Sequence, residues 1–489
     1  MQLIYDGNKI FTVDTALASN FKPGDKLLFT KGVSEPILIP KLAIDLVKTE
    51  VDFAKHGFYQ LATVTDASIN DFYDYFSANL QNDSIWATIQ EINDHDVKKA
   101  KEKGKSTTRL IANDTCRNNM IAGLNDFKHQ NVSRVERLSE YSHEGWSVDL
   151  LKSPLGVVGF IFEGRPNVIA DATGVLKTGN VGVFRVGQDA LDTAKAILEF
   201  ALYPALDKAG ISRHVIRILD SKSRATGWAL FSNTDVNLAV ARGSGQAVRM
   251  LGSIAQYNGI PVSLHGTGGA WMMCSETTDK TRLHAAIVGS LYRKVCNTLN
   301  TLCVLDTHIE SFMPVILDAL KTAGEKLNQS YKVHVEAFSK NYLNPELFSK
   351  KTNVLRATGL CEELQFEIID KDKLGTEWEW EQTPEISIVI TKSTQEAIEL
   401  CNQFSPQFVA SLITTDTVEL NLFFDRVNAP FVGNGMTRWV DGQYALNSPE
   451  LGLSNWEGGR FLARSAILSG DSVFTTRIKM TQDKPNLVR

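Results

Sequence analysis

The chain has 489 residues, of which 43% are hydrophobic and 22% charged, and its formal net charge at pH 7 is -5. This composition is typical of a globular protein with two or three domains, and the mildly acidic balance argues against a nucleic-acid-binding surface. No apolar run approaches the ~20 residues that span a bilayer, and the first residues lack a signal-peptide pattern, so we expect a cytoplasmic protein without membrane contact.

Strands and helices can be predicted in chain order from the hydrophobic pattern. Residues 1–40 alternate apolar and polar positions around turn residues, which predicts a strand-rich N-terminal extension, whereas residues 42–128 follow a helical pattern. From residue 154 onward, apolar runs alternate with helical segments, which predicts a doubly wound α/β sheet. The expected strands of that sheet are 154–162, 179–185, 215–219 and 236–240, with a helix at 190–209.

A second α/β stretch follows residue 296. Its expected strands are 301–305 and 387–391, and its expected helices are 309–324 and 394–404. Residues 370–382 are acidic and polar, so we expect a solvated loop there.

Cys296 lies in the most informative segment of the chain. It is followed by small polar residues and then by an apolar run, which predicts a thiol on a loop or helix start that leads into a buried strand. Amides at a helix end and nearby cations favour the nucleophilic thiolate, although a cysteine can also be a buried structural residue. The six cysteines show no paired spacing, so we expect reduced thiols and no metal site.

Two turns after predicted strands could bind a ligand. Gly243 and Ser244 lie between a strand and a helix, where backbone amides and the helix dipole favour a phosphate, although such glycines can serve packing alone. Asn167 follows a strand and a proline, so its amide could face a ligand at the carboxyl ends of the strands or could cap a helix.

Together these segments resemble the gamma-glutamyl phosphate reductases, a branch of the aldehyde dehydrogenase superfamily. The resemblance extends from about residue 43 to residue 489. It is carried, in order, by Pro154-Leu155-Gly156-Val157-Val158-Gly159, Arg165-Pro166-Asn167-Val168, Leu176-Lys177-Thr178-Gly179-Asn180, Arg242-Gly243, His265-Gly266-Thr267-Gly268, Val295-Cys296-Asn297, Thr437-Arg438 and Leu451-Gly452-Leu453-Ser454.

The resemblance implies a fold with three parts. A doubly wound cofactor domain would span residues 41–275, and an α/β catalytic domain would span 276–455. A small β oligomerisation arm would combine residues 130–153 with the C-terminal segment 456–489. We therefore expect a homo-oligomer, either a dimer or a tetramer.

The resemblance also implies a reaction, the NADPH-dependent reduction of an acyl phosphate to a semialdehyde through a thioester on Cys296, without a metal. The substrate would be gamma-glutamyl phosphate or a related amino-acid acyl phosphate. Asn167 would hold the oxyanion. Arg185 would lie near the adenosine ribose, Gly243 and Ser244 near the cofactor phosphates, and Glu381 near the nicotinamide ribose.

Four further residues are candidates for substrate binding. Arg165 and Arg438 could hold a phosphate or carboxylate, because a guanidinium matches such anions bidentately, or they could form structural ion pairs. Asn297 adjoins the nucleophile in sequence and is expected to contact the substrate. His265 could act as a base, since histidine titrates near neutral pH, or could be structural.

Leu264 bears on the fate of the thioester. It lies near the place of the glutamate that activates water in hydrolytic aldehyde dehydrogenases, so phosphate rather than water should attack the thioester. The segment 289–294 departs from the family pattern of basic residues, which leaves the acyl group open. The alternatives are an aldehyde dehydrogenase or acyl-thioester reductase of another substrate, and a non-catalytic scaffold.

Overall fold

The computed structural model describes residues 2–5, 9–29, 36–104, 107, 109–162, 164–356, 359–447, 449–454 and 467–486. The chain divides into two compact units. Unit 1 contains Met1–Gly266, Gly442–Leu453 and Leu462–Arg489, and unit 2 contains Thr267–Asp441 and Ser454–Phe461. The predicted cofactor domain was given as residues 41–275, whereas residues 267–275 lie in unit 2 and residues 442–453 lie in unit 1.

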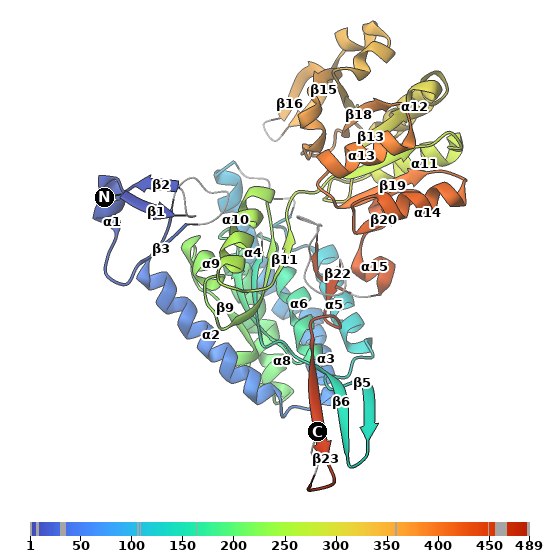
Figure 1. Ribbon diagram of the computed structural model, residues 1–489. Helices are drawn as coiled ribbons and strands as arrows, with labels where there is room; N and C mark the ends of the chain where they lie inside the picture. The colour runs from blue at the N-terminus through green and yellow to red at the C-terminus, as the bar shows by residue number, and fades with distance from the viewer. Residues whose placement is uncertain are drawn as a thin grey trace. The chain divides into compact units, whose positions relative to one another are not determined.

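A five-stranded parallel sheet forms the centre of unit 1 (Figure 1), in the order β11-β10-β7-β8-β9. Its strands are β7 (Val157–Phe162), β8 (Val181–Val186), β9 (Ile216–Ile218), β10 (Val236–Arg242) and β11 (Val262–His265). The chain proceeds from β7 to β8 and β9 and then crosses back to β10 on the other side of β7. That reversal is the topological switch point at which open α/β sheets bind ligands.

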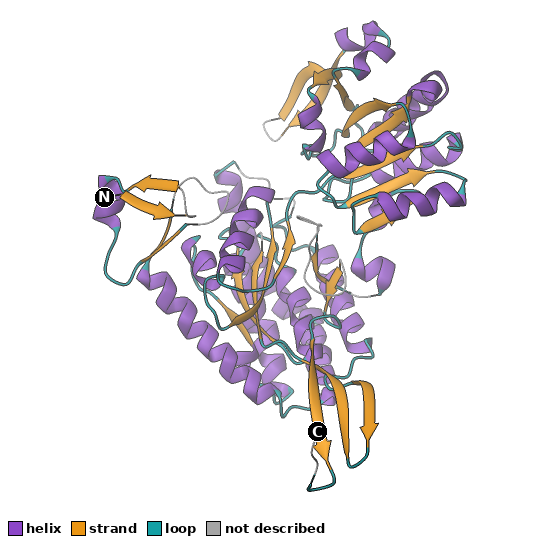
Figure 2. Ribbon diagram, viewed as in Figure 1, coloured by secondary structure: helices purple, strands orange, loops and turns teal. Residues whose placement is uncertain are grey.

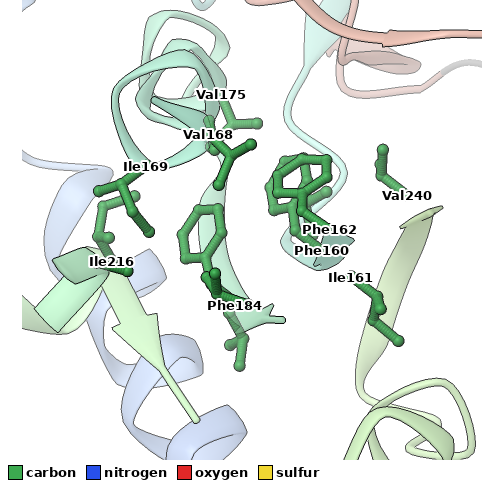
Figure 3. Close-up of a cluster of buried hydrophobic side chains, with 14 of the residues drawn as sticks. Phe160, Ile161, Phe162, Val168, Ile169, Val175, Phe184, Ile216 and Val240 are labelled. Carbon is green, nitrogen blue, oxygen red and sulfur yellow. The ribbon is translucent and has the colours of Figure 1, made fainter. Parts of the chain in front are cut away.

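The core of unit 1 forms because these strands are apolar at nearly every position, as strands covered on both faces must be. Phe160 on β7 and Phe184 on β8 stack with ring centroids 4.9 Å apart and planes at 4°. Figure 3 shows Phe160 and Phe162 on one side of the sheet and Ile161 on the other, as strand alternation requires. The packing of these side chains holds the strands of the sheet in place.

Helices surround this sheet. Polar side chains cap several of them: for example, Thr65, Asn82 and Asn113 accept hydrogen bonds from the first turns of α3, α4 and α5. The predicted helix at 190–209 is interrupted by a π-helical turn at Leu198–Leu202 before Pro204. The helices of unit 1 are α1 (Thr15–Asn20), α2 (Lys41–Leu61), α3 (Asp66–Gln81), α4 (Asp83–Glu102), α5 (Asp114–His129), α6 (Val168–Ala172), α7 (Leu191–Ile197), α8 (Tyr203–Lys208), α9 (Ala225–Leu230), α10 (Gly245–Tyr257) and α15 (Gly442–Leu446).

The described part of the N-terminal extension contains two antiparallel strand pairs. β1 (Gln2–Tyr5) pairs with β2 (Lys9–Thr12), and β3 (Lys26–Leu28) pairs with β4 (Ile37–Ile39). Ile39 is fully buried against the rest of unit 1. The extension is thus anchored to unit 1 through β4.

Three antiparallel strands form an arm, with β6 (Trp146–Ser153) between β5 (Arg137–His143) and β23 (Thr475–Gln482). Figure 1 shows these strands side by side. Two further strands, β21 (Glu450–Leu453) and β22 (Ile467–Ser469), also form an antiparallel pair. One of the two strand partners of β6, β23, comes from more than 300 residues later in the chain. The predicted arm segment 456–489 lies partly outside the described residues, at 456–466 and 487–489.

Within unit 1, buried Asn180 links the C-terminal segment to the start of the central sheet. Its Oδ1 accepts hydrogen bonds from the amides of Leu155 and Gly156 at 2.7 and 3.0 Å. Its Nδ2 donates to the carbonyl of Val473 at 2.6 Å. Thr178 adds a hydrogen bond to the carbonyl of Gly470 at 3.0 Å. One amide therefore connects the start of β7 to the segment before β23.

Unit 2 contains a seven-stranded parallel sheet with helices on both faces (Figure 2), in the order β17-β14-β18-β13-β12-β19-β20. Met272 and Cys274 of β12 pack with α11 and α12, whereas Trp271 and Met273 pack with α13 and α14. The strands are β12 (Ala270–Cys274), β13 (Leu299–Leu305), β14 (Lys332–Glu336), β17 (Phe366–Ile369), β18 (Glu385–Thr391), β19 (Val409–Ile413) and β20 (Phe431–Gly433), with the hairpin β15 (Lys351–Arg356) and β16 (Gly359–Leu364). The helices are α11 (Lys280–Ser290), α12 (Ile309–Lys326), α13 (Thr394–Phe404) and α14 (Thr417–Arg426).

The predicted fold class, a doubly wound cofactor domain and an α/β catalytic domain, is confirmed. Within the described part of the chain, none of the helices is long and apolar enough to cross a membrane.

Candidate active site

Cys296 lies on a tight turn immediately before the buried strand β13, and its side chain is partly exposed. Thr298 closes this turn: its amide donates to the carbonyl of Val295 at 3.1 Å, and its Oγ1 accepts from the amide of Val295 at 2.9 Å. The Thr298 hydroxyl also donates to the carbonyl of Arg293 at 2.7 Å. The thiol therefore lies on a hydrogen-bonded turn that leads into a buried strand, which is the local structure that the sequence predicted.

Two glycines, Gly268 and Gly269, contact the backbone of this turn. Gly269 donates its amide to the carbonyl of Cys296 at 2.6 Å. A Cβ added to Gly268 would lie 2.5 Å from the Cα of Cys296, which is closer than side chains tolerate. The predicted Gly266-Thr267-Gly268 motif thus supplies the close backbone approach that fixes the cysteine.

Burial distinguishes Cys296 from most other thiols of the chain. Cys274, Cys303 and Cys401 are buried, and burial raises the pKa of the Cys274 and Cys401 thiols to about 12. Burial also raises the pKa of Cys116 to about 11. Because the thiolate is the nucleophile, these four residues are unsuited to covalent chemistry near neutral pH.

Asn297 and Arg438, both predicted to bind substrate, contact each other. Arg438 donates from Nη1 to Oδ1 of Asn297 and from Nη2 to the Tyr292 hydroxyl at 3.1 Å. Asn297 Nδ2 donates to the carbonyl of Val440 at 2.6 Å, and Thr437 Oγ1 donates to the carbonyl of Asn297 at 2.7 Å. In this arrangement Asn297 is buried, and the Thr437-Arg438 motif holds the cysteine turn.

A partly buried ion pair lies beside the same turn. Lys294, whose side chain is 6% exposed, contacts Glu377 Oε1 at 2.6 Å. The other oxygen of Glu377 accepts a hydrogen bond from the amide of Gly268. Both carboxylate oxygens of Glu377 are therefore engaged, and Arg293 next to Lys294 is exposed.

The loop 370–382 differs from the solvated loop predicted. Glu377 supports the cysteine turn, and Trp378 donates from Nε1 to Ser387 Oγ at 2.8 Å while its ring stacks on His334 at 3.6 Å. Trp380 is buried. Glu381, predicted to face the nicotinamide ribose, is exposed on this loop in unit 2.

Unit 1 contains a cavity of about 560 Å³ at the carboxyl ends of β7, β8 and β10. A cavity at this switch point, beside the N-terminus of a helix, is the usual place for a dinucleotide in an α/β sheet. Among its lining residues are Phe162, Arg185, Arg224, Trp228, Gly243 and Ser244.

Arg185 and Arg224 supply positive charge to this cavity. Burial lowers the pKa of Arg185, and the nearby charge of Arg224 lowers it further. The Nε of Arg185 is buried and has no hydrogen-bond partner among the residues that the structure describes. A partly buried guanidinium beside a second cation fits an anionic ligand, because an anion would supply the missing acceptors.

Ser244 occupies the N-cap position of α10, and within the described residues its side chain makes no capping hydrogen bond. Gly243 donates its amide to the carbonyl of His265 at 3.2 Å, which fixes the turn before the helix. The 13-residue helix α10 therefore presents first-turn amides toward the cavity. These observations fit the predicted binding of cofactor phosphates at Gly243 and Ser244.

Asn167 lies at the start of α6, after the end of β7. Although it occupies the N-cap position, its side chain makes no capping hydrogen bond within the part of the chain described. Its Nδ2 instead donates to Asp171 Oδ2 at 2.9 Å. Asp171 was missed at the sequence level, although its spacing of four residues on one helix was a usable signal.

Charged residues gather around Asp171 at the ends of β10 and β11. Arg242 lies 3.5 Å from Glu450 of β21, and Arg165 and His265 lie close enough to interact electrostatically with this group. Burial, followed by the charges of Arg242 and Arg165, lowers the pKa of His265 to about 3. A neutral imidazole with so low a pKa is a poor general base near neutral pH.

Comparison with known proteins matches residues 121–335 to the aldehyde dehydrogenase family. The gamma-glutamyl phosphate reductase of Listeria welshimeri is 26% identical over 391 residues, which cover 77% of this chain and 85% of that protein. The gamma-glutamyl phosphate reductase structure from Thermotoga maritima superimposes with a TM-score of 0.77 at 22% identity, covering 91% of this chain and 100% of that chain. An engineered glycolyl-CoA reductase with bound NADP+ superimposes with a TM-score of 0.62 at 15% identity, covering 90% and 98%.

The two structural matches agree with the α/β architecture of both units, and the family match includes the cavity of unit 1 and the cysteine turn of unit 2. Members of this family use nicotinamide cofactors. Residues 121–335 of the chain are thus similar to the aldehyde dehydrogenase family, and the curated relatives that align with most of the chain are gamma-glutamyl phosphate reductases.

Proposed function

We propose that this protein reduces an acyl phosphate, of the gamma-glutamyl phosphate type, to the semialdehyde with NADPH. The observation that carries the proposal is the partly exposed Cys296 thiol, held on a turn that Thr298, Gly268 and Gly269 fix. A nucleophile fixed in this way loses little conformational entropy when it attacks a carbonyl.

The first half of the proposed reaction forms a thioester. The Cys296 thiolate adds to the acyl carbonyl, and the Asn167 amide donates to the oxyanion that develops. The carbon–oxygen bond to phosphate then breaks, and phosphate leaves with the electron pair. Loss of one oxyanion donor costs ~10²–10³ in kcat in comparable sites.

The second half releases the aldehyde. NADPH, when bound in the unit 1 cavity, supplies the hydride that reduces the thioester. Arg185 and Arg224 provide positive charge for an anionic group of the cofactor, and the first turn of α10 provides amides for its phosphates. Collapse of the resulting thiohemiacetal breaks the carbon–sulfur bond and returns the thiolate of Cys296.

Two positions bear on the fate of the thioester, because a carboxylate that is free to activate water would allow hydrolysis. Leu264 is a buried residue packed against Gly252, and Glu377 is engaged by Lys294 and Gly268. Neither residue offers a free base to activate water. Phosphate is therefore the expected partner of the thioester in the reverse direction.

The test is phosphate-dependent reduction of NADP+ with glutamate-5-semialdehyde. Cys296→Ala should lose at least ~10³-fold in kcat, because the covalent step is removed. Cys361→Ala, which alters a partly exposed thiol on the β15–β16 hairpin, is the matched control and should keep its rate. Full activity in Cys296→Ala, or equal rates without phosphate, would refute the proposal.

A further inference from the structure

Asn167 and Asp171 form a hydrogen-bonded pair one helical turn apart. Asn167 is at the start of α6, and its Nδ2 donates to Asp171 Oδ2 at 2.9 Å. An ionised carboxylate can only accept hydrogen bonds, so it selects the orientation of the Asn167 amide in which the nitrogen faces Asp171.

This orientation determines what Asn167 can offer to a substrate. One Nδ2–H is donated to Asp171, and the second, which has no protein acceptor among the described residues, is available to an oxyanion. If the amide were turned over, Oδ1 would replace Nδ2, and an acceptor would face a developing negative charge. The chemistry of an oxyanion site tolerates only the first orientation.

We propose that Asp171 is a positioning residue that fixes the Asn167 amide for oxyanion binding and, when it takes up a proton, releases that amide to turn over. The inference rests on the proposed function, in which Asn167 donates to the oxyanion.

The charges that face Asp171 come from four parts of unit 1. Arg242 on β10 and Arg165 before α6 favour the carboxylate, whereas Glu450 on β21 opposes it, and the Cys116 thiol of α5 also faces it. Burial outweighs the two cations and raises the pKa of Asp171 to about 7. Both protonation states are therefore accessible near neutral pH.

The two states differ in what they offer to Asn167. Above neutral pH the carboxylate accepts from Nδ2, as in the structure. Below it the neutral carboxyl can also donate a hydrogen bond, which Oδ1 of the turned amide accepts. The fraction of enzyme with a correctly oriented Asn167 should therefore fall as the pH falls, and kcat should fall with it.

The test compares kcat and KM of four variants with those of the natural chain across neutral pH, in the phosphate-dependent assay. Asp171→Asn keeps an acceptor for Asn167 but cannot titrate, so it should lose ~3–10-fold in kcat and should lack the decline on the acid side. Phosphate, a substrate in this assay, titrates in the same pH range. The contribution of Asp171 is therefore the difference between the pH profile of kcat for the natural chain and that for Asp171→Asn.

A double-variant comparison tests whether Asp171 acts through Asn167. Asp171→Ala should lower kcat ~10–100-fold with little change in KM, and Asn167→Ala should lower it ~10²–10³-fold. The double variant should be no slower than Asn167→Ala alone, because the positioned group is already gone. NADPH affinity and melting temperature serve as controls for folding.

Additive losses in the double variant, or an unchanged acid decline in Asp171→Asn, would overturn the inference while leaving the proposed function intact. Full activity in Asn167→Ala would overturn it as well, by removing the oxyanion role. Failure of the proposed function itself would appear separately, as activity retained in Cys296→Ala.

Discussion

His265 is held neutral by its surroundings at the end of β11. Burial, with Arg242 and Arg165 nearby, lowers its pKa from 6.5 to about 3. In the native state His265 therefore stays neutral between about pH 6.5 and 3, whereas in the unfolded chain it takes up a proton below about pH 6.5. The stabilisation from His265 is complete above that pH and is lost as the pH falls toward 3.

His265→Gln should remove this contribution. Between about pH 6 and 4 the natural chain should lose up to ~1.4 kcal/mol of unfolding free energy per pH unit from this group, and the variant should lose correspondingly less. Urea unfolding of both proteins at several pH values measures the difference. His284→Gln, which alters a partly exposed histidine of unit 2, is the control. Parallel curves for the natural chain and His265→Gln would show that the group is not held neutral.

At the scale of elements, the end of β8 and the start of α9 bring two guanidiniums to the cavity, from which we expect selectivity between cofactors. Arg185 and Arg224 both line the cavity. The Nε of Arg185 is buried and has no hydrogen-bond partner within the described chain. NADPH differs from NADH by one phosphate, which such a pair of guanidiniums would recognise through charge-assisted hydrogen bonds.

Arg224→Ala should therefore weaken NADPH binding ~10–100-fold, which corresponds to the 1.5–3 kcal/mol of hydrogen bonds to charged groups, and should change NADH binding much less. Fluorescence titration with each cofactor measures both affinities. Arg249→Ala, an exposed residue of α10, is the control and should change neither. Equal losses of affinity for NADPH and NADH would mean that Arg224 does not bind the additional phosphate.

The elements differ in how far the sequence predicts them. β7 and β8 could be predicted because nearly every residue in them is apolar, which marks a strand covered on both faces. The extent of the helix at 190–209 was also predicted, although its π-helical turn was not. The grouping of residues 442–453 with unit 1 was not predicted, because it depends on contacts between segments that are distant in the chain.

The candidate site was predicted less completely. Cys296 and the turn at Gly243 stand next to strands, so local pattern indicates them. The loop 370–382 looked solvated because its partners, Gly268 and Lys294, come from about 80–110 residues earlier. Arg224 was missed for a similar reason, since only the fold brings it beside Arg185. Contacts between distant segments leave no trace in local periodicity.

At the scale of the whole molecule, the arm of β5, β6 and β23 has one apolar face. Ile478 and Met480 of β23 are 74% and 51% exposed, and they pair with Leu150 and Val148 of β6. Tyr141 of β5, which is 58% exposed, is also opposite Val148. Exposed apolar patches of this kind mark contact surfaces, and a second copy of the chain is the partner that the family resemblance implies.

Ile478→Asp should therefore shift the protein toward monomers, because a charge would have to be buried in the contact. Analytical ultracentrifugation over a range of concentrations measures the change. Lys479→Ala, on the opposite face of the same strand, is the control and should leave assembly unchanged. An unchanged assembly in Ile478→Asp would exclude this face as the contact.

The hydrogen bonds of Asn180 have a consequence for synthesis on the ribosome. Asn180 joins the amides before β7 to the carbonyl of Val473, almost 300 positions later. The amino-terminal unit is therefore complete only after translation has passed residue 473, by which time all of unit 2 has been synthesised. Nascent chains must keep the sheet of unit 1 from aggregating throughout that interval, and a pause late in translation would prolong the exposure.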